Sequence, residues 1–455
     1  MKGVNSLQRT EEGKPQVALV TLGDSRREFY QQRIAIVEEE MQKAKTALEK
    51  CFTVYQSPIV YSDAEAEAVA RQIRGRGIGA VVIHLPIWGT PALALRIAQS
   101  TERPVAVLAN KRKDSSSLVV MLAVAGMLDQ CAKPCVRIAG EVNEPETFRQ
   151  LEQYVRACAL VEAVRASEYC MVGGRSIGIG TTVADPAQWA RVFGTSFDHA
   201  DQLEVCLRAE KIDAQRVARH LDWWKKQVKI EFGGRFTPES LDRQMRSYLA
   251  LRDMAAERGY DFLGLKCQQE MSDHYALQCL AVALLNNDCD GALTMRILSL
   301  ACGGAPSCLV DIKFFGEENH GFTLANCGAM APYFADPAGG SYKRVTMMAH
   351  TFGLAGGGAT QMIAAPGPVT VARLFRTNGT YVLGCFEGRT VMKPIEELRK
   401  TTWCYPHQFI EAEVDYDLFL RTMNSNHLHS VYGKYAGLLR QFCEMTGIRF
   451  INYNK

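Results

Sequence analysis

Two residues far apart in the chain have the side chains that hold divalent cations. Asp311 stands in the apolar run Cys308-Leu309-Val310-Asp311-Ile312, and His427 follows Asn426 close to the C-terminus. A carboxylate and an imidazole together suit a hard or borderline ion such as Mn²⁺. An ion held in this way polarises a carbonyl or hydroxyl oxygen that binds to it. We therefore expect Asp311 and His427 to meet at one metal site.

Each of these residues also has a simpler structural interpretation. A charge inside an apolar strand is costly unless it is paired, which favours a functional role for Asp311. His427 and His429 alternate as they would on a strand, so one of them faces any given site and His429 is read as structural. Asp288 and Glu270 precede predicted helices, where capping explains them as well as chemistry does. For the neighbouring Asp290, helix capping is the preferred reading.

The elements that must position these residues alternate between strand and helix in the first third of the chain. Expected strands cover residues 17–23, 52–55, 80–83, 104–108 and 135–139, and expected helices cover 25–50, 64–73, 115–128 and 144–166. Strands that alternate with helices predict a parallel sheet flanked by helices. A second α/β unit is expected from Ser176, with helices over 186–258, 272–285 and 291–301 and strands over 261–266 and 308–314.

The texture changes after residue 330, where proline and glycine become frequent. Asn378-Gly379 lies between two β-rich runs, which is a strong hairpin signal. A β-rich segment closed by a helix over 432–445 is expected. The predicted fold class is α/β, with two Rossmann-like α/β domains with parallel sheets over 1–170 and 171–330, and a β-rich C-terminal domain over 331–455.

The composition excludes several classes of protein. Apolar residues make up 47% and charged residues 22% of the 455, which is typical of a soluble globular protein. The net charge is +3 and no basic block occurs, so a nucleic-acid partner is not expected. No apolar run is long enough to span a membrane, and the N-terminus does not resemble a signal peptide, so we expect no membrane association and a cytoplasmic location. The 15 cysteines include no Cys-x-x-Cys pair and are read as reduced thiols.

Five motifs in the second half of the chain occur in the order and spacing of one known family. They are Lys266-Cys267-Gln268-Gln269-Glu270-Met271-Ser272-Asp273, Asp290-Gly291-Ala292-Leu293-Thr294-Met295, Val310-Asp311-Ile312-Lys313, Ala355-Gly356-Gly357-Gly358-Ala359-Thr360-Gln361 and Ser425-Asn426-His427-Leu428-His429. As a set they resemble the L-fucose isomerase family. The first half resembles it more loosely, through Gly23-Asp24-Ser25-Arg26-Arg27 and Trp88-Gly89-Thr90-Pro91.

The resemblance implies a Mn²⁺-dependent aldose–ketose isomerase that acts on a monosaccharide through an enediol. The expected substrate is a deoxyhexose or a pentose similar to L-fucose or D-arabinose. The family also implies three-domain subunits that form a homo-oligomer, such as a hexamer, with active sites shared between subunits.

The family holds its metal with a glutamate, an aspartate and a histidine. The aspartate matches Asp311, and the histidine matches His427. The glutamate should lie just before the turn at Asp288, yet Leu284-Leu285-Asn286 runs directly into Asn287. The segment that would carry this glutamate is therefore missing. Asp288 is the nearest substitute and is expected to act with Asp311 in catalysis, and Glu270 is a second candidate.

The resemblance also supplies candidate contacts to the sugar. Trp88 and Trp403 would stack on a sugar face, Gln268 and Asn426 would bind hydroxyls, and Arg26 would reach the substrate of a neighbouring subunit. Glu270 is included among these substrate-binding candidates. At base rate, however, tryptophans are packing residues.

Two alternative functions remain open on the same scaffold. One is a catalytically impaired homologue that binds a sugar. The other is an enzyme with different chemistry, such as an isomerase of a modified sugar or a lyase. A dehydrogenase is disfavoured because the sequence contains no nucleotide-binding fingerprint.

Overall fold

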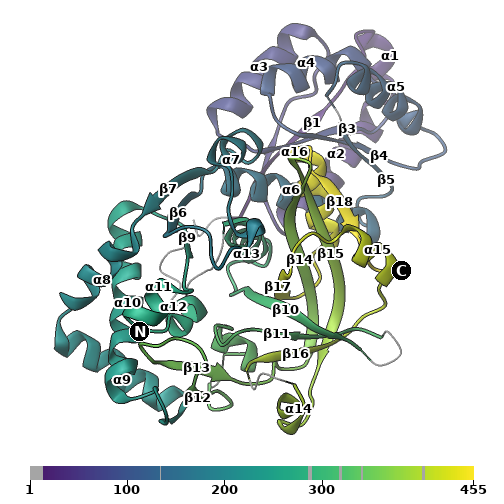
Figure 1. Ribbon diagram of the computed structural model, residues 1–455. Helices are drawn as coiled ribbons and strands as arrows, with labels where there is room; N and C mark the ends of the chain where they lie inside the picture. The colour runs from purple at the N-terminus through teal and green to yellow at the C-terminus, as the bar shows by residue number, and fades with distance from the viewer. Residues whose placement is uncertain (1–13, 134, 285–288, 317–319, 340–341, 402–404) are drawn as a thin grey trace. The chain divides into compact units, whose positions relative to one another are not determined.

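The computed structural model describes residues 14–455 except residue 134 and the ranges 285–288, 317–319, 340–341 and 402–404. The described chain divides into two compact units (Figure 1). We call residues 14–162 the N-terminal unit and residues 163–455 the C-terminal unit.

The N-terminal unit is built on a five-stranded parallel sheet in the order β2–β1–β3–β4–β5. Its strands are β1 (Gln16–Thr21), β2 (Thr53–Gln56), β3 (Ala80–Leu85), β4 (Val105–Ala109) and β5 (Cys135–Ala139). Its helices are α1 (Arg27–Gln31), α2 (Ile34–Glu49), α3 (Asp63–Gly75), α4 (Pro91–Thr101), α5 (Ser117–Gln130) and α6 (Pro145–Arg165). The central strands β3 and β4 are buried along their whole length, as expected for a parallel sheet covered on both faces.

The single helix expected over 25–50 is wrong, because two helices, α1 and α2, occupy that stretch. α1 turns so that buried Tyr30 donates its hydroxyl hydrogen bond to the carbonyl of Leu22 at 2.9 Å. α2 packs inward through Val37 and Met41. Residues 32–33 form a turn that separates the two helices.

The C-terminal unit contains a second, three-stranded parallel sheet in the order β7–β6–β9. Its strands are β6 (Glu168–Val172), β7 (Ser196–Ala200) and β9 (Phe262–Leu265), and the accompanying helices are α7 (Pro186–Val192), α8 (Gln202–Glu210), α9 (Ala214–Gln227), α10 (Pro238–Arg258), α11 (Glu270–His274), α12 (Cys279–Leu284) and α13 (Cys289–Ala301). The unit begins with β6 rather than at Ser176, and the helix expected over 272–285 is two helices, α11 and α12. Both parallel sheets confirm the predicted α/β fold class.

A mixed sheet dominates the rest of the C-terminal unit (Figure 1). Its order is β14–β17–β10–β11–β16–β15–β18, and a further pairing between β14 and β15 closes a ring of strands. The strands are β10 (Cys308–Phe315), β11 (Phe322–Ala325), β14 (Gly367–Thr377), β15 (Thr380–Val391), β16 (His407–Glu411), β17 (His427–Tyr432) and β18 (Arg449–Asn452). This strand-rich sheet confirms the β-rich C-terminal part of the prediction.

The predicted hairpin is confirmed, since Asn378 and Gly379 have φ values of 49° and 76° between β14 and β15. The last helix, α16 (Ala436–Thr446), begins later than expected because residues up to Tyr432 belong to β17.

Smaller elements complete the C-terminal unit. β8 (Lys229–Glu231), β12 (Thr346–Ala349) and β13 (Gly358–Gln361) form a three-stranded sheet, and α14 (Glu396–Arg399) and α15 (Tyr416–Thr422) are short helices. One hydrophobic cluster joins Leu263 of β9 to Val369 of β14. The division of this unit into two domains at residue 330 stays a prediction.

None of the helices in the described part of the chain combines the length and the apolar character that crossing a membrane requires.

Candidate functional site

The pairing of β10 with β17 brings Asp311 and His427 together. The two strands run antiparallel, and Asp311 lies directly opposite His427 in their register. The Nε2 atom of His427 is 3.8 Å from Oδ1 of Asp311. Two residues separated by more than a hundred positions in the sequence therefore present a carboxylate and an imidazole at one point of the sheet.

The burial pattern of β10 explains why this point is accessible. Cys308, Leu309 and Val310 are buried, and the strand first becomes partly exposed at Asp311. The Asp311 side chain is 21% exposed and that of His427 is 15% exposed. The pair thus lies where the strand leaves the core, and both side chains are partly exposed.

A short polar loop leads into β17 and is anchored at three places. Asn424 donates from Nδ2 to Oγ1 of Thr377 at 2.8 Å. The hydroxyl oxygen of Ser425 accepts from the backbone N–H of His427 at 3.2 Å. Asn426 donates from Nδ2 to Oδ1 of Asp311 at 3.2 Å. The loop therefore fixes the start of β17 and contacts the carboxylate directly.

Gln268 and Glu270 lie after β9, the edge strand of the small parallel sheet. The carbonyl of Gln268 accepts a hydrogen bond from Ser176 Oγ at 3.2 Å. Glu270 is in the first turn of α11, and Lys266 lies 2.6 Å from its carboxylate. The hydrogen bond from Lys266 lowers the pKa of Glu270. The structure thus shows Glu270 ion-paired, and its proposed role at the sugar stays a prediction.

Two other predicted site residues, Asp288 and Trp403, lie outside the described residues. Among the residues that the structure describes, no set of three or more His, Cys, Asp or Glu side chains is arranged to hold a metal ion. Asp311 and His427 are the two predicted donors that the described chain brings together.

Cys327, which lies close enough to Asp311 to interact with it, and Cys267 are partly buried residues. Burial, with smaller effects of Cys267 and Asp311, raises the pKa of Cys327 far above its ordinary value. Burial also raises the pKa of Cys267 to about 11. A thiol binds metal as the thiolate, so these groups compete poorly for a cation near neutral pH.

Arg26 and Trp88 belong to the N-terminal unit, at the carboxyl ends of the adjacent strands β1 and β3. Arg26 donates from Nε to Oδ1 of Asp24 at 3.0 Å, and Asp24 is only 2% exposed. The hydrogen bond from Arg26 lowers the pKa of Asp24. Trp88 is partly buried against the core of this unit. In the order β2–β1–β3 the two residues flank the point where the strand order reverses, which is where open α/β sheets bind ligands.

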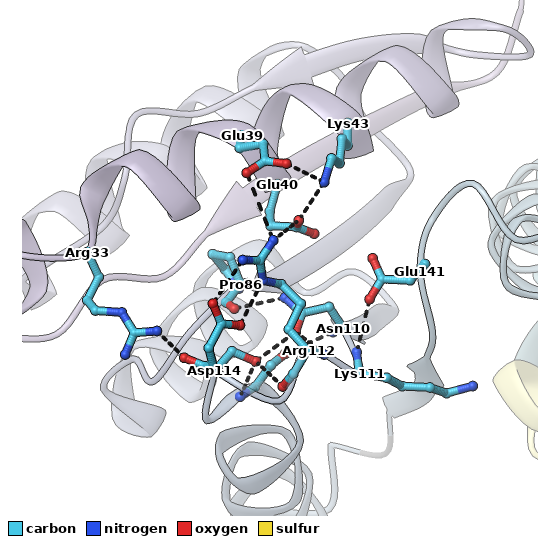
Figure 2. Close-up of polar contacts among 12 residues, drawn as sticks. Arg33, Glu39, Glu40, Lys43, Pro86, Asn110, Lys111, Arg112, Asp114 and Glu141 are labelled. Atoms are coloured by element: carbon cyan, nitrogen blue, oxygen red, sulfur yellow. Dashed lines mark hydrogen bonds and ion pairs between the residues drawn. The ribbon is translucent and has the colours of Figure 1, made fainter.

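The next loop along this edge, between β4 and α5, is held by its own polar contacts (Figure 2). Arg112 bonds both oxygens of Asp114, at 3.0 and 2.9 Å, and reaches Glu40 of α2 at 3.4 Å. Lys43 bonds Glu40 at 3.0 Å. Arg112 lowers the pKa of Asp114. We read this network as structural, since its charges neutralise one another and tie the loop to α2.

Asp290 has a structural role that the sequence interpretation missed. Its carboxylate accepts from Trp189 Nε1 at 3.0 Å, from the Tyr381 hydroxyl at 3.0 Å and from Arg376 Nε at 3.2 Å. Burial raises the pKa of Asp290, against the opposing effect of Arg376. The expected helix cap is therefore a buried anchor, and only its place at the start of α13 could have been inferred from sequence.

An open groove of about 1100 Å³ lies elsewhere on the C-terminal unit. Its lining includes Phe315 and Phe409 together with the charged side chains of Arg389, Glu411 and Lys434. Neither Asp311 nor His427 lines it. The groove is thus separate from the candidate metal site.

Sequence models of one known family match both the N-terminal and the C-terminal part of this chain. The sequence model described as "L-fucose isomerase, first N-terminal domain" matches residues 14–167, and that described as "L-fucose isomerase, C-terminal domain" matches residues 324–454. The chain belongs to the L-fucose isomerase family. The first match contains Arg26 and Trp88 and the second contains His427, while Asp311 lies between them.

Individual members of the family are distant relatives. The sulfoquinovose isomerase of Alkalicoccus urumqiensis is 23% identical over 298 residues, which are 62% of this chain and 64% of that protein. The sulfoquinovose isomerase of Priestia megaterium is 22% identical over 79% of this chain and 82% of its own length. The L-fucose isomerase of Haemophilus influenzae is 23% identical over 36% of this chain and 30% of its own length. The chain thus spans less than two thirds of the first and third of these relatives.

Proposed function

We propose that this protein is a metal-dependent aldose–ketose isomerase. The observation that carries the proposal is the juxtaposition of Asp311 and His427 across β10 and β17, in a chain that belongs to the L-fucose isomerase family. The proposed substrate is a deoxyhexose or pentose similar to L-fucose or D-arabinose. The reaction moves a hydrogen between C1 and C2 through an enediol.

The donor set fits a divalent cation. Donor atoms that share a small hard ion at roughly 2.1 Å stand about 3 Å apart. The 3.8 Å between Asp311 Oδ1 and His427 Nε2 needs only a small side-chain adjustment to reach that spacing. Oxygen and nitrogen donors suit Mn²⁺, which is the ion we propose. When bound, the ion supplies positive charge that polarises the sugar oxygens.

The remaining chemistry belongs to the chain's own acids. A carboxylate at the site takes the proton from one carbon and returns it to the other, as in general acid–base catalysis. Asp311 is the described residue that we assign to this step, and Asp288 is proposed as its partner. Gln268, Glu270, Trp88 and Trp403 are proposed contacts to the sugar, with Arg26 supplied by a neighbouring subunit of a homo-oligomer.

The test is turnover of L-fucose and D-arabinose with Mn²⁺ in D₂O, followed by NMR. Deuterium should enter the ketose at C1 as it accumulates, and C2 of the aldose that re-forms by the reverse reaction, and chelation should stop both. Asp311→Asn should lower kcat by a factor of about 100 or more, since acid–base groups contribute factors of that size. Glu411→Gln, on β16 of the same sheet, is the matched control and should retain activity. Undiminished turnover by Asp311→Asn would refute the assignment.

A sulfonated sugar is a second candidate substrate. Relatives named sulfoquinovose isomerase align over as much as 79% of this chain, whereas the L-fucose isomerase of Haemophilus influenzae aligns over 36%. Comparing kcat/KM for sulfoquinovose with that for L-fucose separates the two. Sugar binding and metal binding without any turnover would instead support the impaired, sugar-binding homologue, which the missing glutamate segment favours.

A further inference from the structure

We infer that Asn426 is a positioning residue for the carboxylate of Asp311, and that it acts on cation binding rather than on the sugar. The inference rests on the proposed function, because it concerns the same site. It assigns to Asn426 a different role from the sugar contact expected from the sequence.

The direct contact carries the inference. The Nδ2 group of Asn426 donates to Oδ1 of Asp311 at 3.2 Å, and His427 Nε2 approaches the same oxygen at 3.8 Å. A hydrogen bond to an ionised acceptor is stronger than one between neutral groups. One carboxylate oxygen of Asp311 therefore has both the Asn426 amide and the His427 imidazole close to it.

The backbone around Asn426 is held independently of that bond. Asn424 is tied to Thr377 at the end of β14, and Ser425 is tied to the backbone N–H of His427. Asn426 and His427 are consecutive, and His427 is locked in register opposite Asp311. The loop that carries the Asn426 amide is thus held by two contacts that do not involve Asp311.

Such an arrangement has a specific energetic consequence. Asp311 lies where β10 becomes partly exposed, so its side chain has room for other rotamers. A bond that selects one rotamer lowers the conformational cost of binding an ion. Partners that orient metal ligands in this way typically contribute 10- to 100-fold in metal affinity.

The two roles for Asn426 predict different measurements. A positioning residue affects the Mn²⁺ dissociation constant in the absence of sugar, and lowers kcat at fixed metal more than it changes KM. A residue that only binds a sugar hydroxyl raises KM and leaves Mn²⁺ affinity in the absence of sugar unchanged.

The experiment measures Mn²⁺ affinity of the whole chain by electron paramagnetic resonance of the free ion, without sugar. Asn426→Ala should weaken binding about tenfold. Asn426→Gln, which keeps the donor on a longer side chain, should recover most of the loss. Asn424→Ala is the matched control from the same loop and should stay within about twofold of wild type, since its amide bonds Thr377 and not Asp311. Circular dichroism and the midpoint of thermal unfolding check that each variant is folded.

The outcomes separate this inference from the proposed function. Wild-type turnover and Mn²⁺ binding with an unchanged dissociation constant in Asn426→Ala would overturn only the positioning role. Equal losses in Asn424→Ala and Asn426→Ala would overturn it as well, because the effect would then come from loop order. Absence of Mn²⁺ binding by the wild-type chain would overturn both.

Discussion

The carboxylate of Asp290 holds four elements of the C-terminal unit together. It receives hydrogen bonds from Trp189 of α7, Arg376 of β14 and Tyr381 of β15, while Asp290 itself lies on α13. The side chain is 3% exposed. A buried charge that keeps its partners is tolerated, but removing one member leaves the others without compensation.

Substitutions of Asp290 should therefore lower the free energy of unfolding by an amount that depends on how many acceptor oxygens remain. Asp290→Ala leaves Arg376, Tyr381 and Trp189 without their acceptor, and should lower the free energy of unfolding by about 3–5 kcal/mol. Asp290→Asn keeps one acceptor oxygen and should cost less. Urea unfolding followed by tryptophan fluorescence measures both. Asp213→Asn at the N-cap of α9 is the control, because aspartate and asparagine cap equally well and the change should be close to zero. A stable Asp290→Ala protein would contradict the anchoring role.

At the candidate site, the sequence indicates which residues could bind a metal but not which of them lie next to one another. Asp311 was singled out because a charge in an apolar strand needs a reason, and His427 because of its context. Their juxtaposition depends on the register of β10 against β17, and register is set by pairing between distant segments. The bond from Asn426 to Asp311 follows from that register and could not have been predicted without it.

β3 contains a buried histidine whose protonation makes the stability of the N-terminal unit depend on pH. His84 is 3% exposed, and its Nδ1 is 3.1 Å from the hydroxyl of Thr21 on β1. Burial lowers the pKa of His84 to about 4, from 6.5 in the unfolded chain. Above pH 6.5 the imidazole is neutral in both states. Between pH 6.5 and 4 the unfolded chain binds the proton and the folded chain does not, so stability falls as the pH falls.

The sheet of the N-terminal unit should consequently weaken in mild acid. His84 should contribute a loss of about 3 kcal/mol in the free energy of unfolding between pH 6.5 and 4. The measurement is urea unfolding at a series of pH values for wild type and His84→Gln. The variant should show a shallower decline with falling pH than wild type. Identical slopes for wild type and His84→Gln would contradict the assignment.

Helices and strands were predicted correctly where the hydrophobic pattern of the sequence agrees with the burial of the element in the fold. β3 and β4 read as apolar runs because both of their faces are buried, whereas the edge strand β5 is only partly buried. The positions of all three agree with the expected strands to within two residues. The turn at residues 32–33 between α1 and α2 was missed because Tyr30 and Met41 fit one helical spacing and pack in the same hydrophobic cluster. β6 was missed, although β4 and β5 have the same length of five residues and were predicted.

For the molecule as a whole, the proposed site residues fall in two separate units. Arg26 and Trp88 lie in the N-terminal unit, and Asp311 and His427 lie in the C-terminal unit. The family resemblance assigns Arg26 to the substrate of a neighbouring subunit and Trp88 to stacking on a sugar face. An assembly of this kind makes each active site a joint product of two chains.

Subunit complementation tests that arrangement directly. Arg26→Ala removes the contribution to a neighbour's site, and Asp311→Asn removes the contribution to the chain's own site, so each variant alone should be nearly inactive. When the two are co-expressed with different tags and purified through both, some sites combine an intact Arg26 from one chain with an intact Asp311 from the other. Random mixing of equal amounts gives about a quarter of the sites this composition, and hence about a quarter of wild-type activity.

The control is a mixture of the two proteins purified separately and assayed before their subunits exchange, which should show only the sum of the two residual activities. Light scattering should find an oligomer of the 50.5 kDa chain in every sample. If co-expressed chains form mixed oligomers and yet recover nothing beyond that sum, Arg26 and Asp311 do not act across a subunit boundary. A monomeric wild-type protein with full activity would exclude shared sites altogether, because a single chain would then supply every residue that the reaction needs.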